Sequence, residues 1–256
     1  MPLPLLKKVL PAKARLSLRK FFWLSRSWLY LGGKVYCPLC ETTFRTFLPF
    51  GSERRPQALC PRCHTLERHR LLWLYLQEQV KIKERPLMVL HMAPEPILQK
   101  RLKNLPNLHY RSADLTSPVA MDLVDIQALP YPTASFDLIL CSHVLAHVPN
   151  DRQALQELRR VLTPTGQLLL QARLHSHATT VENPNAKTPQ QRLKAYGQAD
   201  RFRNYGHDFA QRVAVQGFKV KAVEYANSRT PEEQAWLGLG NHELIFVATH
   251  SAHGVA

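Results

Sequence analysis

Four cysteines in two close pairs are the clearest candidates for chemistry in the sequence. The pairs are Cys37 with Cys40 and Cys60 with Cys63, and 19 residues lie between the pairs. Each pair is expected to form a tight turn that points two thiolates at one ion, and four sulfur ligands suit tetrahedral Zn²⁺ at about 2.3 Å. The spacing therefore predicts a four-cysteine zinc ribbon. Its metal is expected to be structural, because four protein ligands leave no open position.

Two alternatives stay open for this motif. His64 follows Cys63 directly and could replace a cysteine as ligand, and one of the close pairs could serve in redox exchange. Five cysteines, four of them in close pairs, indicate a metal site in a reducing compartment rather than a disulfide framework. We therefore expect a cytoplasmic, metal-binding protein.

Two histidines four residues apart are candidates for proton transfer. His143 and His147 follow an apolar run that is expected to be a strand. An imidazole can accept or donate a proton near neutral pH, so we take His143 as the candidate catalytic residue. The alternative for both histidines is a buried, hydrogen-bonded side chain that shapes the loop.

A polar segment at residues 198–209 is a candidate substrate-binding segment. It is rich in arginine and aromatic residues, and Arg203 and Tyr205 could bind an anionic or sugar-like molecule as substrate-binding residues. The alternative is structural, with Arg203 paired to Asp200 and with Asp208 capping the helix that follows.

Short apolar runs that alternate with helical patterns must position these candidates. Such alternation predicts an α/β fold, here a Rossmann-like doubly wound, mostly parallel sheet preceded by a small zinc-ribbon module. The final two strands are expected to form an antiparallel edge, and residues 163–166 (TPTG) and 175–191 are expected to be a turn and a loop. Strands are expected at residues 87–92, 108–113, 121–125, 136–142, 167–172, 218–226 and 243–249, and helices at 66–80, 96–105, 152–162 and 208–216.

Several motifs after residue 86 resemble those of class I S-adenosylmethionine-dependent methyltransferases, of the methyltransferase type 11-like group. The matching segments cover about a third of the chain in the family's order. They are 88–95 (MVLHMAPE), 112–115 (SADL), 125–130 (DIQALP), 135–139 (SFDLI), 143–148 (HVLAHV) and 157–166 (ELRRVLTPTG).

The resemblance implies that S-adenosylmethionine binds at the carboxyl ends of the first strands. In the family, the residue matching Asp114 accepts hydrogen bonds from the ribose, and that matching Asp125 accepts them from the adenine amino group. The first loop departs from the family pattern, because residues 91–95 (HMAPE) contain no glycine. The cofactor-binding residues implied by the resemblance are His91, Ala93, Glu95, Asp114, Asp125 and Ile126.

Positive charge is concentrated in the first third of the chain. Residues 1–85 carry 17 basic and 5 acidic residues, a net +12 of the total +15. This excess predicts an anionic membrane surface or RNA as a partner of residues 1–70. The longest apolar run has six residues, whereas a spanning helix needs about twenty, so no transmembrane segment is expected. In the basic amphipathic segment at residues 1–33, Phe21, Phe22, Trp23 and Trp28 could lie on an anionic bilayer.

The expected organisation has four parts. They are a basic amphipathic segment (1–33), the zinc ribbon (34–65), a connecting helix (66–85) and a class I methyltransferase domain (86–256). The function expected from the resemblance is S-adenosylmethionine-dependent methyl transfer to an unidentified small-molecule or glycan-linked acceptor, by a cytoplasmic enzyme that is peripheral at the membrane. Two alternatives are a zinc-ribbon RNA methyltransferase and a non-catalytic zinc adaptor on a degenerate methyltransferase fold.

Overall fold

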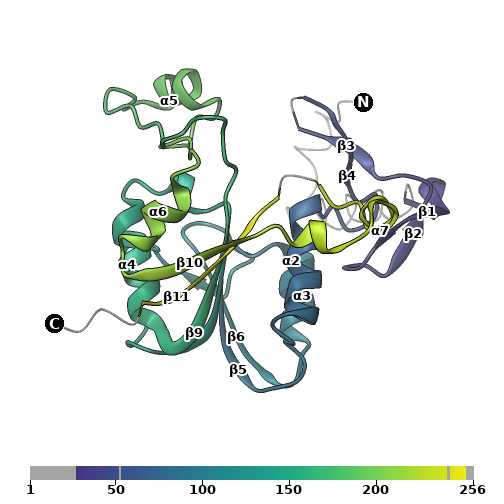
Figure 1. The fold of residues 1–256 in the computed structure, drawn as a ribbon, viewed down its shortest axis with the longest axis horizontal. Helices are drawn as coiled ribbons and strands as arrows, with labels where there is room; N and C mark the ends of the chain where they lie inside the picture. Colours follow the sequence, from purple (N-terminus) through teal and green to yellow (C-terminus); the bar gives the residue numbers. More distant parts are fainter. Residues whose placement is uncertain (1–26, 52, 241–242, 252–256) are drawn as a thin grey trace, which may run out of the picture. The chain divides into compact units, whose positions relative to one another are not determined.

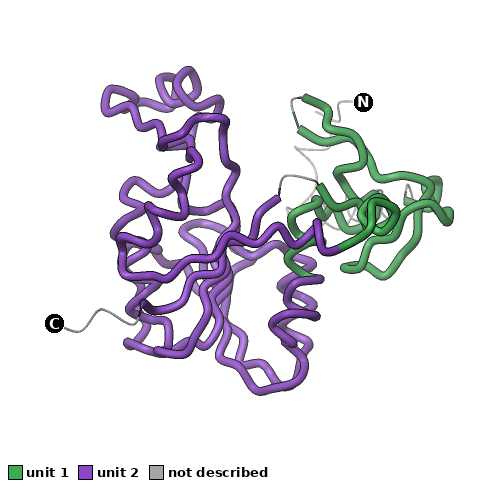
Figure 2. Tube along the Cα trace, in the orientation of Figure 1, with its two compact units in different colours: residues 1–73, 229–240 green, residues 74–228, 241–256 purple. Residues whose placement is uncertain are grey.

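The computed structural model describes residues 27–51, 53–240 and 243–251. The chain divides into unit 1, made of residues 1–73 and 229–240, and unit 2, made of residues 74–228 and 241–256 (Figure 2). Most of the predicted amphipathic segment, with Phe21, Phe22 and Trp23, lies outside the described residues. Across the described ranges, no helix is both long and apolar enough to cross a membrane.

Unit 2 is built on one seven-stranded sheet in the order β10-β11-β9-β8-β5-β6-β7 (Figure 1). From β7 to β9 neighbouring strands pair in parallel, whereas β11 is antiparallel to both β9 and β10. The order changes direction between β5 and β8, and ligands of open α/β sheets bind beside such a switch point. The strands are β5 (Leu87–Met92), β6 (Leu108–Asp114), β7 (Asp122–Leu123), β8 (Phe136–Ser142), β9 (Leu162–Gln171), β10 (Phe218–Val223) and β11 (Ile245–His250).

The central strands form because both of their faces are buried. In β8 the consecutive residues Leu138, Ile139 and Leu140 are all buried, as expected for a parallel strand covered on both sides. Helix α4 (Asp151–Val161) buries Leu155 and Leu158 on one face, and its first turn is capped by Asn150. The other helices of unit 2 are α3 (Pro96–Lys103), α5 (Pro189–Tyr196) and α6 (Phe209–Ala214), with short 3-10 turns η2 (Leu145–His147) and η3 (Tyr225–Ser228).

The predicted α/β fold is confirmed, and two segments differ from the prediction. Residues 163–166 are part of β9 rather than a turn before it. Leu162 pairs with Phe136 and Gln167 pairs with Leu138, so the extra residues form a bulge in the ladder. The segment predicted as a loop at 175–191 ends in α5, whose first turn has a capping box made by Thr188 and Gln191.

Unit 1 consists of two small antiparallel hairpins and a helix from late in the chain. Strand β1 pairs with β2, and β3 pairs with β4. Helix α7 lies within the range predicted for the methyltransferase domain, but it belongs to this unit, where its Trp236 ring stacks on Tyr36 at 6.0 Å between ring centroids. The elements are η1 (Trp28–Tyr30), β1 (Leu31–Cys37), β2 (Thr42–Phe44), β3 (Leu48–Phe50), β4 (Arg55–Leu59) and α7 (Pro231–Leu237), and α2 (Glu67–Glu78) begins in unit 1.

Candidate metal centre and active site

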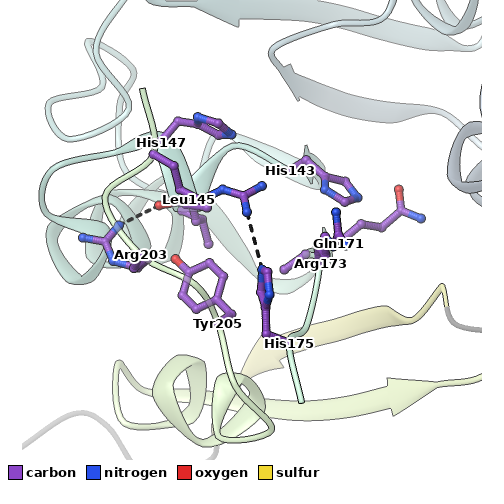
Figure 3. A pocket seen from close by; sticks show the side chains of 11 residues that line it. His143, Leu145, His147, Gln171, Arg173, His175, Arg203 and Tyr205 are labelled. Atoms are coloured by element: carbon purple, nitrogen blue, oxygen red, sulfur yellow. Dashed lines mark hydrogen bonds between the residues drawn. The ribbon is translucent and has the colours of Figure 1, made fainter. Parts of the chain in front are cut away.

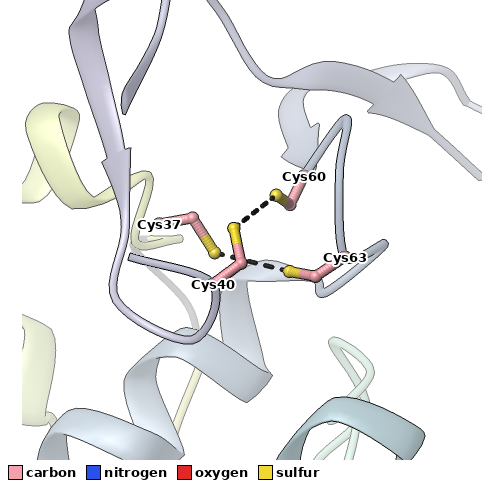
Figure 4. Close-up of side chains that lie close together, drawn as sticks. All are labelled: Cys37, Cys40, Cys60 and Cys63. Carbon is pink, nitrogen blue, oxygen red and sulfur yellow. Dashed lines mark hydrogen bonds between the residues drawn. The ribbon is translucent and has the colours of Figure 1, made fainter. Parts of the chain in front are cut away.

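The four paired cysteines meet at one point in unit 1 (Figure 4). Their sulfur atoms all lie within 4.8 Å of one another, and the Sγ atoms of Cys37 and Cys63 are 3.6 Å apart, those of Cys40 and Cys60 3.7 Å. A tetrahedron with Zn–S bonds of about 2.3 Å has sulfur–sulfur edges of about 3.8 Å. The spacing of the sulfurs therefore matches tetrahedral zinc, and His64 is not part of the group.

The two cysteine turns have the same backbone geometry. Glu41 and His64, which follow the second cysteine of each pair, both have positive φ, of 52° and 59°. Each donates its N–H to the carbonyl of the first cysteine, at 2.8 Å for Cys37 and 3.1 Å for Cys60. The hydroxyl of Thr65 lies 3.1 Å from the Cys63 Sγ, where it can donate to a thiolate. His64 thus has a backbone role beside the four-cysteine cluster, one that its position in the sequence did not reveal.

Arg70 connects the cysteine turns to α7. Its side chain is completely buried, and its guanidinium donates to the carbonyls of Ala58 and Thr65 near the cysteines and of Leu237 and Gly238 at the end of α7. Burial lowers the pKa of Arg70, and the neighbouring thiols and Glu67 raise it. A cation at this position offsets the negative charge that four thiolates would bring.

In unit 2, three of the predicted site residues lie at the carboxyl ends of adjacent strands. Ala93 follows β5, Asp114 ends β6 and His143 follows β8, on both sides of the switch point. Ala93 and His143 have positive φ, of 48° and 57°, which is uncommon for residues with a side chain. Such conformations persist where the surrounding structure enforces them, and they cluster at functional sites.

His91 and Glu95 form a hydrogen-bonded pair. His91 is fully buried in β5, where its Nδ1 lies 2.9 Å from the hydroxyl of Tyr110 and its Nε2 lies 3.1 Å from Oε2 of Glu95. Both ring nitrogens are therefore occupied by protein groups. His91 orients Glu95 at the start of α3.

Asp114 and Asp125 both shape turns. Oδ1 of Asp114 accepts the N–H groups of Thr116 and Ser117 at 2.8 and 2.6 Å, and among the described residues its Oδ2 accepts none. Both carboxylate oxygens of Asp125 accept from Gln127 instead. Ile126 is buried in the core of the sheet. Of these residues, Asp114 keeps an oxygen that is available to a ligand.

A pocket at the ends of β8 and β9 contains His143 and His147 (Figure 3). The Nε2 of His143 lies 3.9 Å from a carboxylate oxygen of Glu243, and the Nδ1 of His147 lies 3.2 Å from Asp200. The described residues that line the pocket include three arginines and three histidines and no carboxylate. The lining therefore carries a net positive charge, and we call this space the cationic pocket.

Arg203 and Tyr205, the predicted acceptor-binding residues, line this pocket but bind mainly to the protein itself. The guanidinium of Arg203 donates to the carbonyls of Leu145 and Val148 at 2.8 and 2.6 Å and to Glu182 at 2.6 Å. The Tyr205 hydroxyl donates to Asp151 at 2.8 Å. The partner expected for Arg203, Asp200, pairs with His147 instead, and both candidates fasten their segment onto α4 and η2.

Arg201 also lines this pocket, and the sequence did not single it out. It is 9% exposed, and its Nη1 lies 3.1 Å from the side-chain oxygen of Asn204 and 3.4 Å from Nε2 of His175. Burial and the nearby charge of Arg173 lower the pKa of Arg201. The only signal in the sequence was the density of arginine in residues 198–209.

The central part of the chain is similar to a known protein family. Residues 91–170, from near the end of β5 to the next-to-last residue of β9, match the family described as a methyltransferase domain. The matched range contains the carboxyl ends of β5, β6, β7 and β8.

Two curated proteins are similar over part of this range. The 27-O-demethylrifamycin SV methyltransferase of Amycolatopsis mediterranei is 34% identical over 74 residues, which cover 29% of this chain and 27% of that protein. Methyltransferase GfsG of Streptomyces halstedii is 40% identical over 60 residues, 23% of this chain and 22% of that protein. The matched segment thus spans about a quarter of the length of these relatives.

A solved structure is similar over a longer range. The 1,6-didemethyltoxoflavin-N1-methyltransferase of Burkholderia thailandensis, with bound 1,6-didemethyltoxoflavin and S-adenosylhomocysteine, aligns with a TM-score of 0.48 and 17% identity. The alignment covers 70% of this chain and 76% of that one.

Proposed function

We propose, from the match of residues 91–170 to the family described as a methyltransferase domain, that the chain transfers a methyl group from S-adenosylmethionine to an acceptor molecule. The observation that carries this proposal is the row of Ala93, Asp114 and His143 at adjacent strand ends beside the switch point. S-adenosylmethionine, when bound, supplies a methyl group on a sulfonium that is already a good leaving group. The protein then has to bind, orient and exclude water.

The residues at these strand ends fit such a cofactor. Oδ2 of Asp114 can accept a hydrogen bond from a ribose hydroxyl, and the exposed side chain of Leu115, which follows it, offers an apolar surface to a purine ring. Oδ2 of Asp125, which accepts one hydrogen bond from Gln127, would accept a second from the adenine amino group, and the backbone amide of Ile126 would contact the ring. These roles are the ones that the resemblance of the motifs implies, assigned here to residues at the strand ends.

The first loop has the backbone shape that its missing glycines would supply. Glycine adopts positive φ freely, and in this loop Ala93 adopts it with a φ of 48°. Its N–H donates to the carbonyl of Ala113 at 2.8 Å, which fixes the loop against β6. We therefore propose that Ala93 and Glu95, the latter oriented by His91, hold the amino-acid part of the cofactor.

His143 is proposed as the residue that handles the acceptor proton. It follows β8 next to the switch point, lines the cationic pocket, and its imidazole can accept a proton near neutral pH. We propose Zn²⁺ as a structural ion bound by Cys37, Cys40, Cys60 and Cys63.

A small-molecule acceptor is favoured over RNA. One relative is named for a single compound, 27-O-demethylrifamycin SV, and the proposed acceptor side of the site is a pocket rather than an open surface. The basic charge of residues 1–85 supports RNA or an anionic membrane as a docking partner. Most of the aromatic residues on which the membrane prediction depends precede residue 27 and lie outside the described residues.

Calorimetric titration with S-adenosylmethionine and S-adenosylhomocysteine tests the proposal. The wild-type protein is expected to bind both at micromolar concentration, about −8 kcal/mol. Asp114→Asn should weaken binding by about 1–3 kcal/mol, because a charged hydrogen-bond acceptor is lost. Asp137→Asn is the matched control, since Asp137 also accepts a backbone N–H but lies at the start of β8. Absence of binding at millimolar ligand would favour the non-catalytic adaptor.

A further inference from the structure

The cationic pocket at the ends of β8 and β9 contains a buried arginine without a counter-ion. Arg201 has no ion-pair partner among the described residues, and its Nε is buried without a hydrogen-bond acceptor in that part of the chain. Its Nη1 interacts only with the neutral groups of Asn204 and His175. A buried guanidinium is costly unless an anion or enough acceptors surround it.

The carboxylates near the pocket are engaged elsewhere. Asp200 pairs with His147 and its side chain is largely exposed, while Glu182 and Asp151 bind Arg203 and Arg212. Glu243 lies 3.9 Å from His143. None of these carboxylates lies within ion-pair distance of Arg201 in the described structure. The charge of the largely exposed Asp200 acts on Arg201 from farther away and raises its pKa, so the protein itself compensates this buried charge only in part.

The groups around Arg201 add positive charge and therefore favour a bound anion. Arg173 lines the same pocket, and its charge together with burial lowers the pKa of Arg201. Burial, followed by the charges of Arg173 and Arg201, lowers the pKa of His175 as well, so its ring is neutral at pH 7 and its Nε2 accepts from Arg201. His175 therefore holds the guanidinium in place without adding charge.

We infer that Arg201 binds an oxyanion of the methyl acceptor, a carboxylate or a phosphate ester on a small molecule. The inference rests on the proposed function, since it names the acceptor class for the same site. The pocket lies at the carboxyl ends of β8 and β9, and His143 is shared between it and the switch point. An anion on Arg201 would hold the acceptor on the β8–β9 side of the cofactor, with His143 between the two.

Anion binding is measured on the full chain loaded with S-adenosylhomocysteine, at constant ionic strength. Inorganic phosphate represents a phosphate ester, benzoate represents a carboxylate, and benzamide is the uncharged control for benzoate. Wild-type protein is expected to bind phosphate or benzoate and not benzamide, and whichever anion binds more tightly identifies the source of the oxyanion.

Arg201→Gln should weaken binding of that anion at least tenfold, and Arg201→Lys should weaken it less. Arg85→Gln removes an equal charge from an exposed residue just before β5 and should leave binding unchanged. The inference is overturned if wild type binds neither anion, or if Arg201→Gln and wild type bind equally. The wild-type titration decides the first point even if Arg201→Gln does not fold.

Binding of S-adenosylhomocysteine, measured first on each protein, separates the two proposals. If S-adenosylhomocysteine does not bind, the proposed function fails, and the anion titration is then carried out on the protein without this ligand. If it binds and neither anion does, only the assignment of Arg201 fails.

Discussion

At the scale of single residues, Asp151 holds together the segment that forms one wall of the cationic pocket. This buried carboxylate accepts two hydrogen bonds of 2.7 Å from Arg212 and one of 2.8 Å from Tyr205. Burial raises the pKa of Asp151. The hydrogen bonds from Arg212 and Tyr205 and the charge of Arg203 lower it by more than burial raises it, so the pKa of Asp151 is below its ordinary value.

Stability should therefore depend on this carboxylate at low pH. A carboxyl whose pKa is lower in the folded than in the unfolded state stabilises the fold above its unfolded pKa, about 3.9, and loses that contribution as the pH falls further. We expect the free energy of unfolding to fall steeply below about pH 4. Urea unfolding between pH 3 and pH 7 measures this.

Asp151→Asn is the variant that isolates the effect. It should lower stability at pH 7 by about 1–3 kcal/mol, because Arg212 and Arg203 lose the buried carboxylate and keep the half-exposed Glu182 as a partner. Its stability should also fall less steeply below pH 4 than that of wild type. Equal slopes for the two proteins would show that another carboxyl causes the acid sensitivity.

Substitution of Ala93 tests the backbone of the first loop. Ala93→Gly should stabilise the protein by up to about 1 kcal/mol, because glycine adopts positive φ without steric cost, whereas Ala93→Val should destabilise it by more than 1 kcal/mol. Thermal unfolding of the two variants measures the difference. A stabilising effect of valine would mean that the loop does not hold a positive φ in solution.

At the scale of elements, α7 and α5 both end in a glycine with positive φ. Gly238 follows α7 with φ 58°, and a Cβ on it would collide with the Phe47 ring and approach Arg70. Gly197 follows α5 with φ 77° and has nothing within 4 Å of a Cβ. The two positions thus differ in packing and not in the sign of φ.

We expect Gly238→Ala to destabilise the protein clearly more than Gly197→Ala. Gly197→Ala costs about 1 kcal/mol of backbone strain. Gly238→Ala has the same strain and adds about 1–3 kcal/mol for the collision of the new Cβ with the Phe47 ring. Denaturant unfolding followed by tryptophan fluorescence compares them. Similar losses in both variants would indicate that α7 does not pack on Phe47.

The sheet could be predicted because its central strands are apolar on both faces and short turns separate them. The ends of β5 and β8 were placed correctly on that basis. The assignment of α7 to unit 1 could not be predicted, since it depends on contacts between Arg70 and residues 167 and 168 positions later. Local patterns contain no information about such contacts.

The site was predictable in part for a similar reason. The cysteine spacing alone predicted the cluster, because two short turns fix four sulfurs. The choice between Arg201 and Arg203 could not be made, since the two residues are next-but-one neighbours in an irregular segment. Tyr205 of that segment forms an isolated bridge with Leu174, and this pairing fixes the path of the segment. The path decides which guanidinium reaches the carbonyls of η2.

At the scale of the whole molecule, metal removal should act on unit 1. Purified protein is expected to contain about one zinc per chain, and a strong chelator should lower the stability of residues 27–73 and 229–240, because a structural zinc contributes directly to folding. Hydrogen exchange read by peptide measures which residues lose protection.

Cysteine substitutions give the matched comparison. Cys60→Ser should lose most of the zinc, whereas Cys141→Ala, which changes a buried cysteine of β8 outside the cluster, should retain it. Less than half an equivalent of zinc in wild type purified without chelator would contradict four-sulfur ligation.

The late position of α7 in the chain has a consequence for synthesis on the ribosome. Arg70 is made long before Gly238, whose carbonyl it binds 168 residues later. At about 5–20 residues per second, the delay is roughly 8–34 seconds. During that interval the cysteines can already bind zinc, while the Arg70 guanidinium lacks the carbonyls of Leu237 and Gly238. The nascent chain would then carry a metallated but unfinished module, which can be completed only after α7 and Gly238 have been translated.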